Sequence, residues 1–163
     1  MKKLLIATLL AVTANAWAQG AATVTVKDAW VRATVAQQKA TGAFMQLTAK
    51  ADTKVVEASS SIAGVVEIHE MAMEKDVMRM RAMPALDLPA GKTVELKPGG
   101  YHVMLMDLKG PVKEGDVVSL LLVLEGKDGQ RETLEVKAPV RALNAKTAKG
   151  DGHGGGHGPG PKH

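Results

Sequence analysis

A succession of nine strand-length segments, each with partial apolar–polar alternation, constrains the fold of this chain most strongly. The segments cover residues 23–34, 41–50, 53–60, 65–74, 77–83, 93–99, 101–108, 116–126 and 131–140. Short turn signals separate them, among them Lys75-Asp76 and Pro98-Gly99-Gly100. No long helical period is present between these segments. The pattern predicts an all-β sandwich or barrel.

The composition limits what can fill the core of such a fold. Aromatic residues make up only 2% of the 163-residue chain, and it contains no cysteine. Without disulfides, stability depends on buried apolar side chains, which a body of this size can supply. We therefore expect a core of Val, Leu, Ile, Ala and Met.

The N-terminal residues have the features of a secretory signal peptide. Lys2 and Lys3 precede an apolar run over residues 4–12, and Ala16 and Ala18 form a cleavage pattern of the A-x-A kind. No apolar stretch is long enough for a membrane span. We expect cleavage after Ala18, which leaves an exported, soluble domain over residues 19–143. Removing the two lysines lowers the formal charge from +4 to about +2, too little to indicate nucleic-acid binding.

The last twenty residues, 144–163, differ from the rest of the chain. They are rich in Gly and Pro and contain His153, His157 and His163. Such a composition buries little apolar surface, so we predict a disordered tail. Its glycine-separated histidines are candidates for a secondary metal site.

Methionine is concentrated in one short segment. Five of the nine methionines lie between His69 and Met83. A strand period of two aligns His69, Met71 and Met73 on one face. A two-residue turn at Lys75-Asp76 would return Met78 and Met80 on that face, with Met71 opposite Met80 and His69 diagonal to it. The simplest alternative is that these methionines fill an irregular core.

A second segment, residues 101–108, combines histidine with methionine in the same way. His102, Met104 and Met106 share one face, and Val103 and Leu105 lie on the other. Both faces are apolar, so the alternation leaves open which of them is the core. We expect the histidines and methionines to lie at an end of the barrel, where side chains that point inward become accessible.

Imidazole and thioether donors together select Cu(I) over zinc, calcium or magnesium. A blue-copper electron-transfer centre is excluded because it requires a cysteine thiolate. There is also no serine–histidine–aspartate set, thiol nucleophile or convincing pair of carboxylates. We therefore expect a binding protein rather than an enzyme.

The spacing of these residues resembles that of the periplasmic copper chaperones of the PCu(A)C family, whose pattern is His-x10-Met-x21-His-x-Met. The matching residues are His69, Met80, His102 and Met104, and the similarity extends over residues 24–140. The resemblance implies a Greek-key, cupredoxin-like β-barrel with these four side chains as Cu(I) ligands. Met71, Met78 and Met106 then become a soft surround of the site.

The resemblance also implies a biological role. A periplasmic metallochaperone would pass Cu(I) by ligand exchange to the Cu(A) centre of cytochrome c oxidase or to a Sco-type protein. A C-terminal extension with metal-binding residues, as some family members have, would bind a second copper as Cu(II). We expect a monomer.

Two other functions remain open from the sequence. The protein could be a periplasmic copper buffer or storage protein in which the His-rich tail matters more than the barrel. It could also be an unrelated secreted β-sandwich, such as an adhesive or carbohydrate-binding module, although few aromatic residues are present for sugar stacking.

Overall fold

The computed structural model of the chain describes residues 23–142, which form ten β-strands and contain no helix that could span a membrane. The strands are β1 (Val24–Arg32), β2 (Ala40–Ala49), β3 (Thr53–Ser59), β4 (Ala63–Glu74), β5 (Val77–Met83), β6 (Leu86–Leu88), β7 (Thr93–Leu96), β8 (His102–Leu108), β9 (Val117–Gly126) and β10 (Arg131–Arg141). The predicted all-β fold is confirmed, and nine strands correspond to the predicted segments. The remaining strand, β6, is three residues long, too short for an alternation to reveal it.

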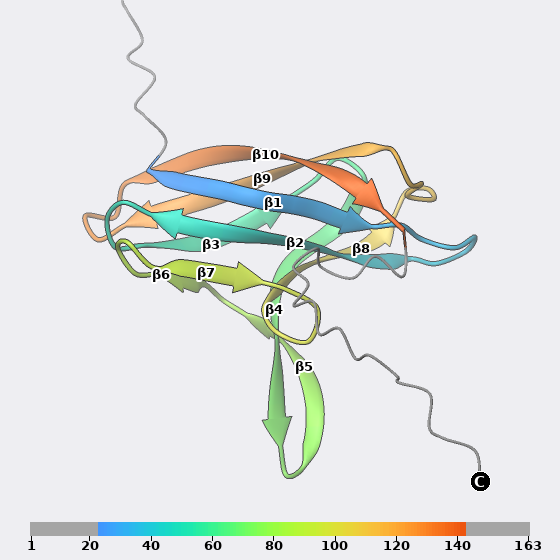
Figure 1. Cartoon of the computed structure of the whole chain (residues 1–163), viewed down its shortest axis with the longest axis horizontal. Helices are drawn as coiled ribbons and strands as arrows, with labels where there is room; N and C mark the ends of the chain where they lie inside the picture. The colour runs from blue at the N-terminus through green and yellow to red at the C-terminus, as the bar shows by residue number, and fades with distance from the viewer. Residues whose placement is uncertain (1–22, 143–163) are drawn as a thin grey trace, which may run out of the picture.

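The strands form two layers of a sandwich (Figure 1). Sheet A contains β5, β4, β8, β2 and β1 in that order, with β7 also paired to β2, and sheet B contains β10, β9, β3 and β6. The two sheets are joined where β1 and β10 run parallel over two residue pairs, Val31↔Val140 and Arg32↔Arg141. Because β8 lies between β2 and β4, distant parts of the chain become neighbours, as in the predicted Greek-key, cupredoxin-like topology.

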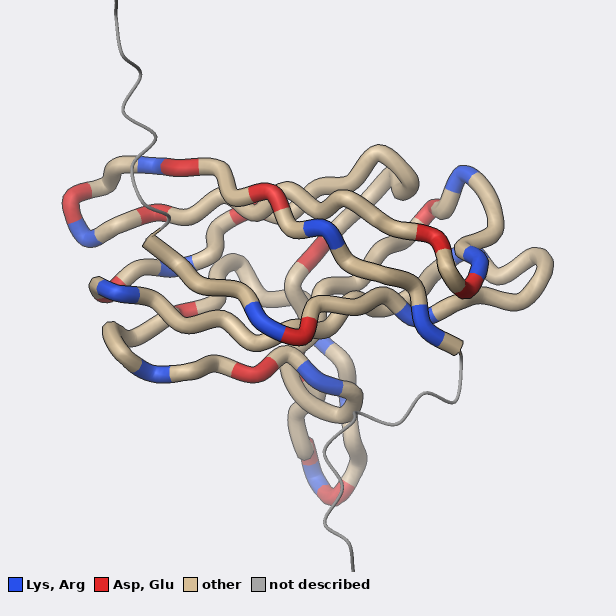
Figure 2. Tube along the Cα trace, turned by 45° about the horizontal axis from the view of Figure 1, so that its top comes forward, with Lys and Arg blue, Asp and Glu red and all other residues tan. Residues whose placement is uncertain are grey.

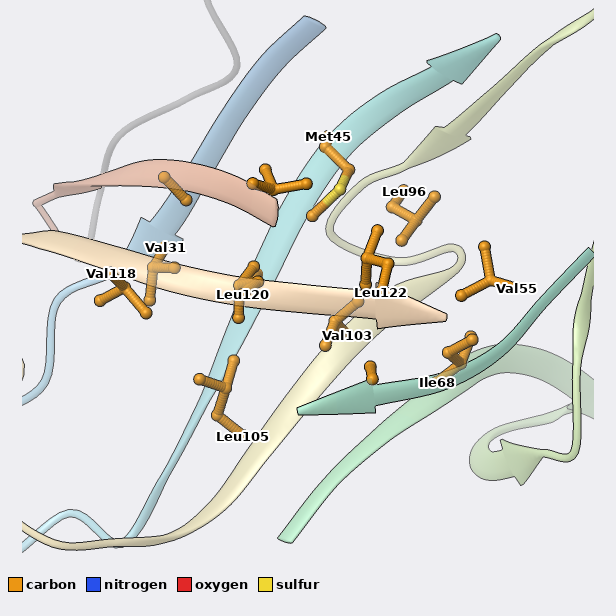
Figure 3. Packing of buried hydrophobic residues seen from close by; sticks show 14 of the residues in the cluster. Val31, Met45, Val55, Ile68, Leu96, Val103, Leu105, Val118, Leu120 and Leu122 are labelled. Atoms are coloured by element: carbon orange, nitrogen blue, oxygen red, sulfur yellow. The ribbon is translucent and has the colours of Figure 1, made fainter. Parts of the chain in front are cut away.

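The core between the sheets is aliphatic. Figure 3 shows Leu120 and Leu122 of β9 packed among side chains of sheet A that include Met45 of β2 and Val103 and Leu105 of β8. All members of this buried cluster are Val, Leu, Ile, Ala or Met, which confirms the predicted core composition. Burial of this apolar surface is the main driving force for the fold.

Two aromatic side chains are buried outside this core. Trp30 of β1 and Phe44 of β2 lie directly opposite each other, with their ring centroids 4.6 Å apart. In β2, Ala43 and Met45 belong to the core cluster, so the intervening Phe44 points away from it. The outer face of sheet A therefore carries its own small packed group.

The hairpin of β4 and β5 extends away from the body of the sandwich (Figure 1). Lys75 and Asp76 form its turn with φ values of 48° and 63°, the two positive values of a type I′ turn. The register pairs Glu74 with Val77 and Met71 with Met80, which confirms the predicted two-residue turn. The outer strand β5 is the edge of sheet A, and nearly all of its residues are exposed.

The packing of β9 generates a stability prediction. Leu122→Ala removes a side chain that is 1% exposed and should lower the free energy of unfolding by about 2–5 kcal/mol, because a cavity remains. Leu121→Ala, next to it on the outer face at 41% exposure, should cost about 1 kcal/mol or less. Urea unfolding followed by circular dichroism measures both, and equal losses would contradict the assigned core face.

Candidate metal centre

The pairing of β4 with β8 brings the two histidines together. His69 lies directly opposite His102, and Glu67 lies opposite Met104. On the other side of β4, Met71 lies opposite Met80 of β5. Since successive side chains alternate between faces, all these residues lie on one face of sheet A.

That face is the outer one, which corrects the expectation of an inward-pointing site at a barrel end. Val103 and Leu105 of β8, with Ile68 of β4, belong to the core cluster, so the intervening His102 and Met104 point away from it. The alternation of β8 could not decide this, because both of its faces are apolar. His102 is nevertheless only 7% exposed.

A hydrogen bond to the turn that precedes β8 holds the His102 ring in one tautomer. Its Nδ1 lies 3.0 Å from the carbonyl oxygen of Gly100. A carbonyl can only accept a hydrogen bond, so Nδ1 carries the proton and Nε2 presents a lone pair. Fixing the second ring nitrogen in this way is typical of metal-binding histidines.

The lone pair of His102 faces a sulfur atom. Its Nε2 lies 3.3 Å from Sδ of Met80, so two electron-pair donors without a proton between them face each other. Tetrahedral bonds of about 2.0 Å to nitrogen and 2.3 Å to sulfur, as at zinc, would separate such donors by about 3.5 Å. The observed distance therefore suits two ligands of one soft metal ion.

His69 completes this group from β4. The rings of His69 and His102 have centroids 5.8 Å apart. Nε2 of His69 donates to the Glu67 carboxylate at 2.8 Å, whereas its Nδ1 is buried and has no hydrogen-bond partner. A buried polar atom without a partner is costly unless something else satisfies it. A metal ion on the same side as His102 would do so, with Glu67 as the carboxylate that orients the ring.

The register of β8 with its two neighbouring strands places Met104 on the same face as His102. It is half-buried, opposite Glu67 of β4 on one side and Gly42 of β2 on the other. The Phe44 ring lies over Gly42, where an added Cβ would be 2.9 Å from its Cζ atom. Phe44 also lies 6.4 Å from the His102 ring, centroid to centroid. This apolar wall limits access of water to one side of the site.

The other predicted positions are arranged around these four. Met71 is half-buried opposite Met80, and Met106 is half-buried one pair further along β8. Met78 lies nearer the hairpin tip, paired with Met73. The tail histidines His153, His157 and His163 lie outside the described residues.

Burial determines the charge state of His102. Desolvation is the main cause that lowers the pKa of its imidazole from the usual 6.5, and electrostatic interactions with His69 and Arg32 lower it further. The hydrogen bond to Gly100 acts in the opposite direction but does not reverse the shift. The ring is therefore neutral near pH 7, the form that binds a metal.

Three residues of this environment, Glu67, Phe44 and Arg32, were not predicted from the sequence. Glu67 could have been found, since it is two positions before His69 on the same strand face. Phe44 and Arg32 come from β2 and β1, and only the strand order brings them near His102. Within residues 23–142, no group of three or more His, Cys, Asp or Glu side chains is placed to hold a metal.

Comparison with known proteins places the chain in a family. Residues 24–140 match the family described as "Putative lipoprotein LpqE-like". The chain belongs to the LpqE-like family. The protein named "Putative lipoprotein Lxx21020" from Leifsonia xyli subsp. xyli is 35% identical to it over 119 residues, which are 72% of this chain and 69% of that protein.

Solved structures share the fold of this LpqE-like protein. The solution structure of apo-DR1885 from Deinococcus radiodurans is 32% identical with a TM-score of 0.56, covering 87% of this chain and 94% of that chain. The solution structure of the Cu(I) form of DR1885 has the same identity and TM-score, and the match covers 77% of this chain and 83% of that chain. The apo PCuAC domain from PmoF1 has a TM-score of 0.60 at 24% identity over 74% of this chain and 95% of that chain, which shows a common fold.

The lowered pKa of His102 predicts how stability of the metal-free protein depends on pH. Below pH 6.5 the unfolded chain takes up a proton at this ring that the folded chain resists, so stability should fall as the pH decreases through 6.5. His102→Asn, which keeps an amide donor near Gly100, should flatten this slope between about pH 7.5 and 5.5. Urea midpoints across that range measure it.

Two carboxyl groups with lowered pKa values, Asp52 and Glu125, act outside this pH window. The pKa values of Asp52 and Glu125 are lowered by hydrogen bonds to Lys127 and Lys54, from usual values of 3.8 and 4.5. The stability that they contribute is lost only at more acidic pH. An unchanged slope in His102→Asn would contradict the assignment.

Proposed function

We propose that this LpqE-like protein is a periplasmic copper metallochaperone that holds Cu(I) with His69, Met80, His102 and Met104. The observation that carries the proposal is the 3.3 Å approach of the His102 Nε2 lone pair to the Met80 sulfur, beside the unpartnered Nδ1 of His69. Two neutral imidazoles and two thioethers form a soft donor set that suits Cu(I). The Cu(I)-bound solution structure of DR1885, at 32% identity, supports copper as the cargo.

The unequal burial of the ligands supports release by ligand exchange. Met80 is 48% exposed on the edge strand β5, whereas His102 is 7% exposed and anchored to the Gly100 carbonyl. An incoming ligand reaches the metal first on the side of Met80, because only that donor is widely open to solvent. Met80 would leave first, and the histidines would hold the ion until the acceptor has formed its first bond.

The proposal includes the cellular location of the protein and the acceptor of its copper. We propose cleavage after Ala18, a copper-binding domain over residues 19–143, and transfer to the Cu(A) centre of cytochrome c oxidase, directly or through a Sco-type protein. The lipoprotein names of the matching family and relative support export to the cell envelope. The protein acts as a binding protein in this proposal, with no chemical transformation of its cargo.

The four-ligand site can be tested by removing half of it. The double variant His102→Ala/Met104→Ala should bind Cu(I) at least about a hundredfold more weakly in competition with a chromogenic Cu(I) chelator, because loss of an outer-shell partner alone costs about 10–100-fold. Met73→Ala, a 64% exposed methionine nearer the hairpin tip, is the matched control and should bind like the parent.

A milder variant separates ligand loss from damage to the fold. Met80→Ala changes an exposed side chain, so the far-ultraviolet circular dichroism should stay unchanged while Cu(I) affinity falls by about tenfold or more. Parent-like Cu(I) affinity in both Met80→Ala and the double variant would show that copper binds elsewhere.

Deletion of residues 144–163 distinguishes the chaperone from a tail-centred copper buffer. The shortened protein should keep the Cu(I) affinity of the parent, because the four proposed ligands all precede residue 143. It should lose Cu(II) binding if His153, His157 and His163 hold a second copper. Titration of both proteins with each oxidation state measures this, and loss of Cu(I) binding on deletion would favour the buffer.

A further inference from the structure

Two neighbouring arginines lie at the ends of β1 and β10. Arg32 and Arg141 are paired across the parallel contact between these strands, and both are half-buried. The guanidinium carbon of Arg32 lies 5.3 Å from the centroid of the Phe44 ring, and that of Arg141 lies 5.5 Å from the Trp30 centroid. Stacking on an aromatic face restricts a guanidinium group without using its hydrogen-bond donors.

The arginine pair belongs to the same face of the molecule as the metal centre. The Trp30 and Phe44 rings are 4.6 Å apart, and Phe44 and His102 are 6.4 Å apart, centroid to centroid. These residues lie on β1, β2 and β8, which are successive neighbours in sheet A. A continuous row of rings therefore connects the arginines to the proposed ligands, and one docked molecule could contact both.

The two arginines differ from the other arginines of the described chain in having no carboxylate partner. Arg79, Arg81 and Arg131 form ion pairs with Glu74, Glu70 and Glu125 respectively. Within residues 23–142, no carboxylate lies within 4.0 Å of Arg32 or Arg141, and the Arg32 Nε is buried without an acceptor. A buried donor of this kind is costly unless an acceptor satisfies it.

The charge around this pair is otherwise mixed. Figure 2 shows basic and acidic residues interspersed over the body rather than gathered in blocks of one sign. Attraction of an acidic molecule to this face therefore depends on local recognition by the two guanidinium groups. A guanidinium fork matches a carboxylate with two parallel hydrogen bonds, which gives orientation as well as attraction.

We propose that Arg32 and Arg141 form a docking site for a carboxylate side chain of the copper-accepting protein, which orients the acceptor over the metal centre. This inference rests on the proposed function and adds the chemistry of the partner: an acidic surface beside the acceptor's own copper ligands. Charge pairs at such a site act mainly on the rate of association, and salt weakens them.

The competing explanation is that the arginines only cover Trp30 and Phe44. In that case their loss would lower stability, but transfer would not depend on the charge of the acceptor. The double variant Arg32→Gln/Arg141→Gln separates the two explanations. Its matched control is Lys127→Gln/Arg131→Gln, which removes the same charge from the region of the turn between β9 and β10.

The experiment measures the rate at which Cu(I) is removed from the full-length, copper-loaded protein by two chelators. Bicinchoninate carries carboxylates, and neocuproine is uncharged. At low ionic strength, Arg32→Gln/Arg141→Gln should lose copper to bicinchoninate about tenfold more slowly than the parent, whereas its rate with neocuproine and both rates of the control should stay unchanged. About 0.5 M salt should remove the advantage of the parent.

A second double variant tests whether the effect comes from lost charge or from a folding defect. Arg32→Lys/Arg141→Lys keeps both charges and much of the cover over the rings, so it should retain the salt dependence that the glutamine variant loses. Parent-like transfer to bicinchoninate in a folded glutamine variant would overturn the proposal. So would a bicinchoninate rate in the lysine variant as slow and as insensitive to salt as that of the glutamine variant.

Two further outcomes distinguish other causes. If the parent binds vesicles of phosphatidylglycerol and the glutamine variant does not, while their bicinchoninate rates are equal, the arginines bind a lipid phosphate and the proposal is wrong. If the parent retains no Cu(I) before chelator is added, the proposed function itself fails, and that failure is visible without any arginine variant.

Discussion

The pairing of β4 with β8 is the interaction on which the proposed metal centre depends. It places His69 opposite His102 and Glu67 opposite Met104. A slip of one residue would turn every donor on one strand to the opposite face of the sheet. The register is fixed by the buried sides of the same strands, where Ile68, Val103 and Leu105 pack in the core. Hydrophobic packing on one face thus sets the positions of the proposed ligands on the other.

The proposed metal centre lies where the body of the sandwich meets the protruding hairpin of β4 and β5 (Figure 1). The body contributes His102, which is buried, tied to a backbone carbonyl and bordered by Phe44. The hairpin contributes Met80 from a strand that is paired on one side only. This combination suits a protein that must both retain an ion and release it, because one ligand is held in place while another is open to exchange. Arg32 and Arg141 lie on the same face of the molecule, stacked on Phe44 and Trp30, and are the proposed contact for the acceptor.

Some elements of the fold could be predicted from the sequence and others could not. The hairpin turn, the Met71–Met80 pairing and the aliphatic core were predicted correctly, because each follows from local alternation and turn chemistry. The three-residue strand β6 was missed, since its two buried leucines, Leu86 and Leu88, have no local pattern to distinguish them. The expected inward orientation of the donors was wrong, because β8 has apolar residues on both faces and its alternation does not indicate which face is buried.

The class of fold and the strand register within the hairpin could be predicted from the amino-acid sequence, because they depend on residues close together in the chain. The candidate donors could be named because their spacing along the chain matches a family pattern. The position of the donors on the outer face of sheet A, by contrast, is visible only in the folded protein. The strand order also places Glu67 beside His69, Phe44 beside His102, and the arginine pair against Phe44 and Trp30 on the same face. These relations depend on the strand order and on which face of each strand is buried. Both are set by packing between segments far apart in the sequence, so no local sequence pattern indicates them.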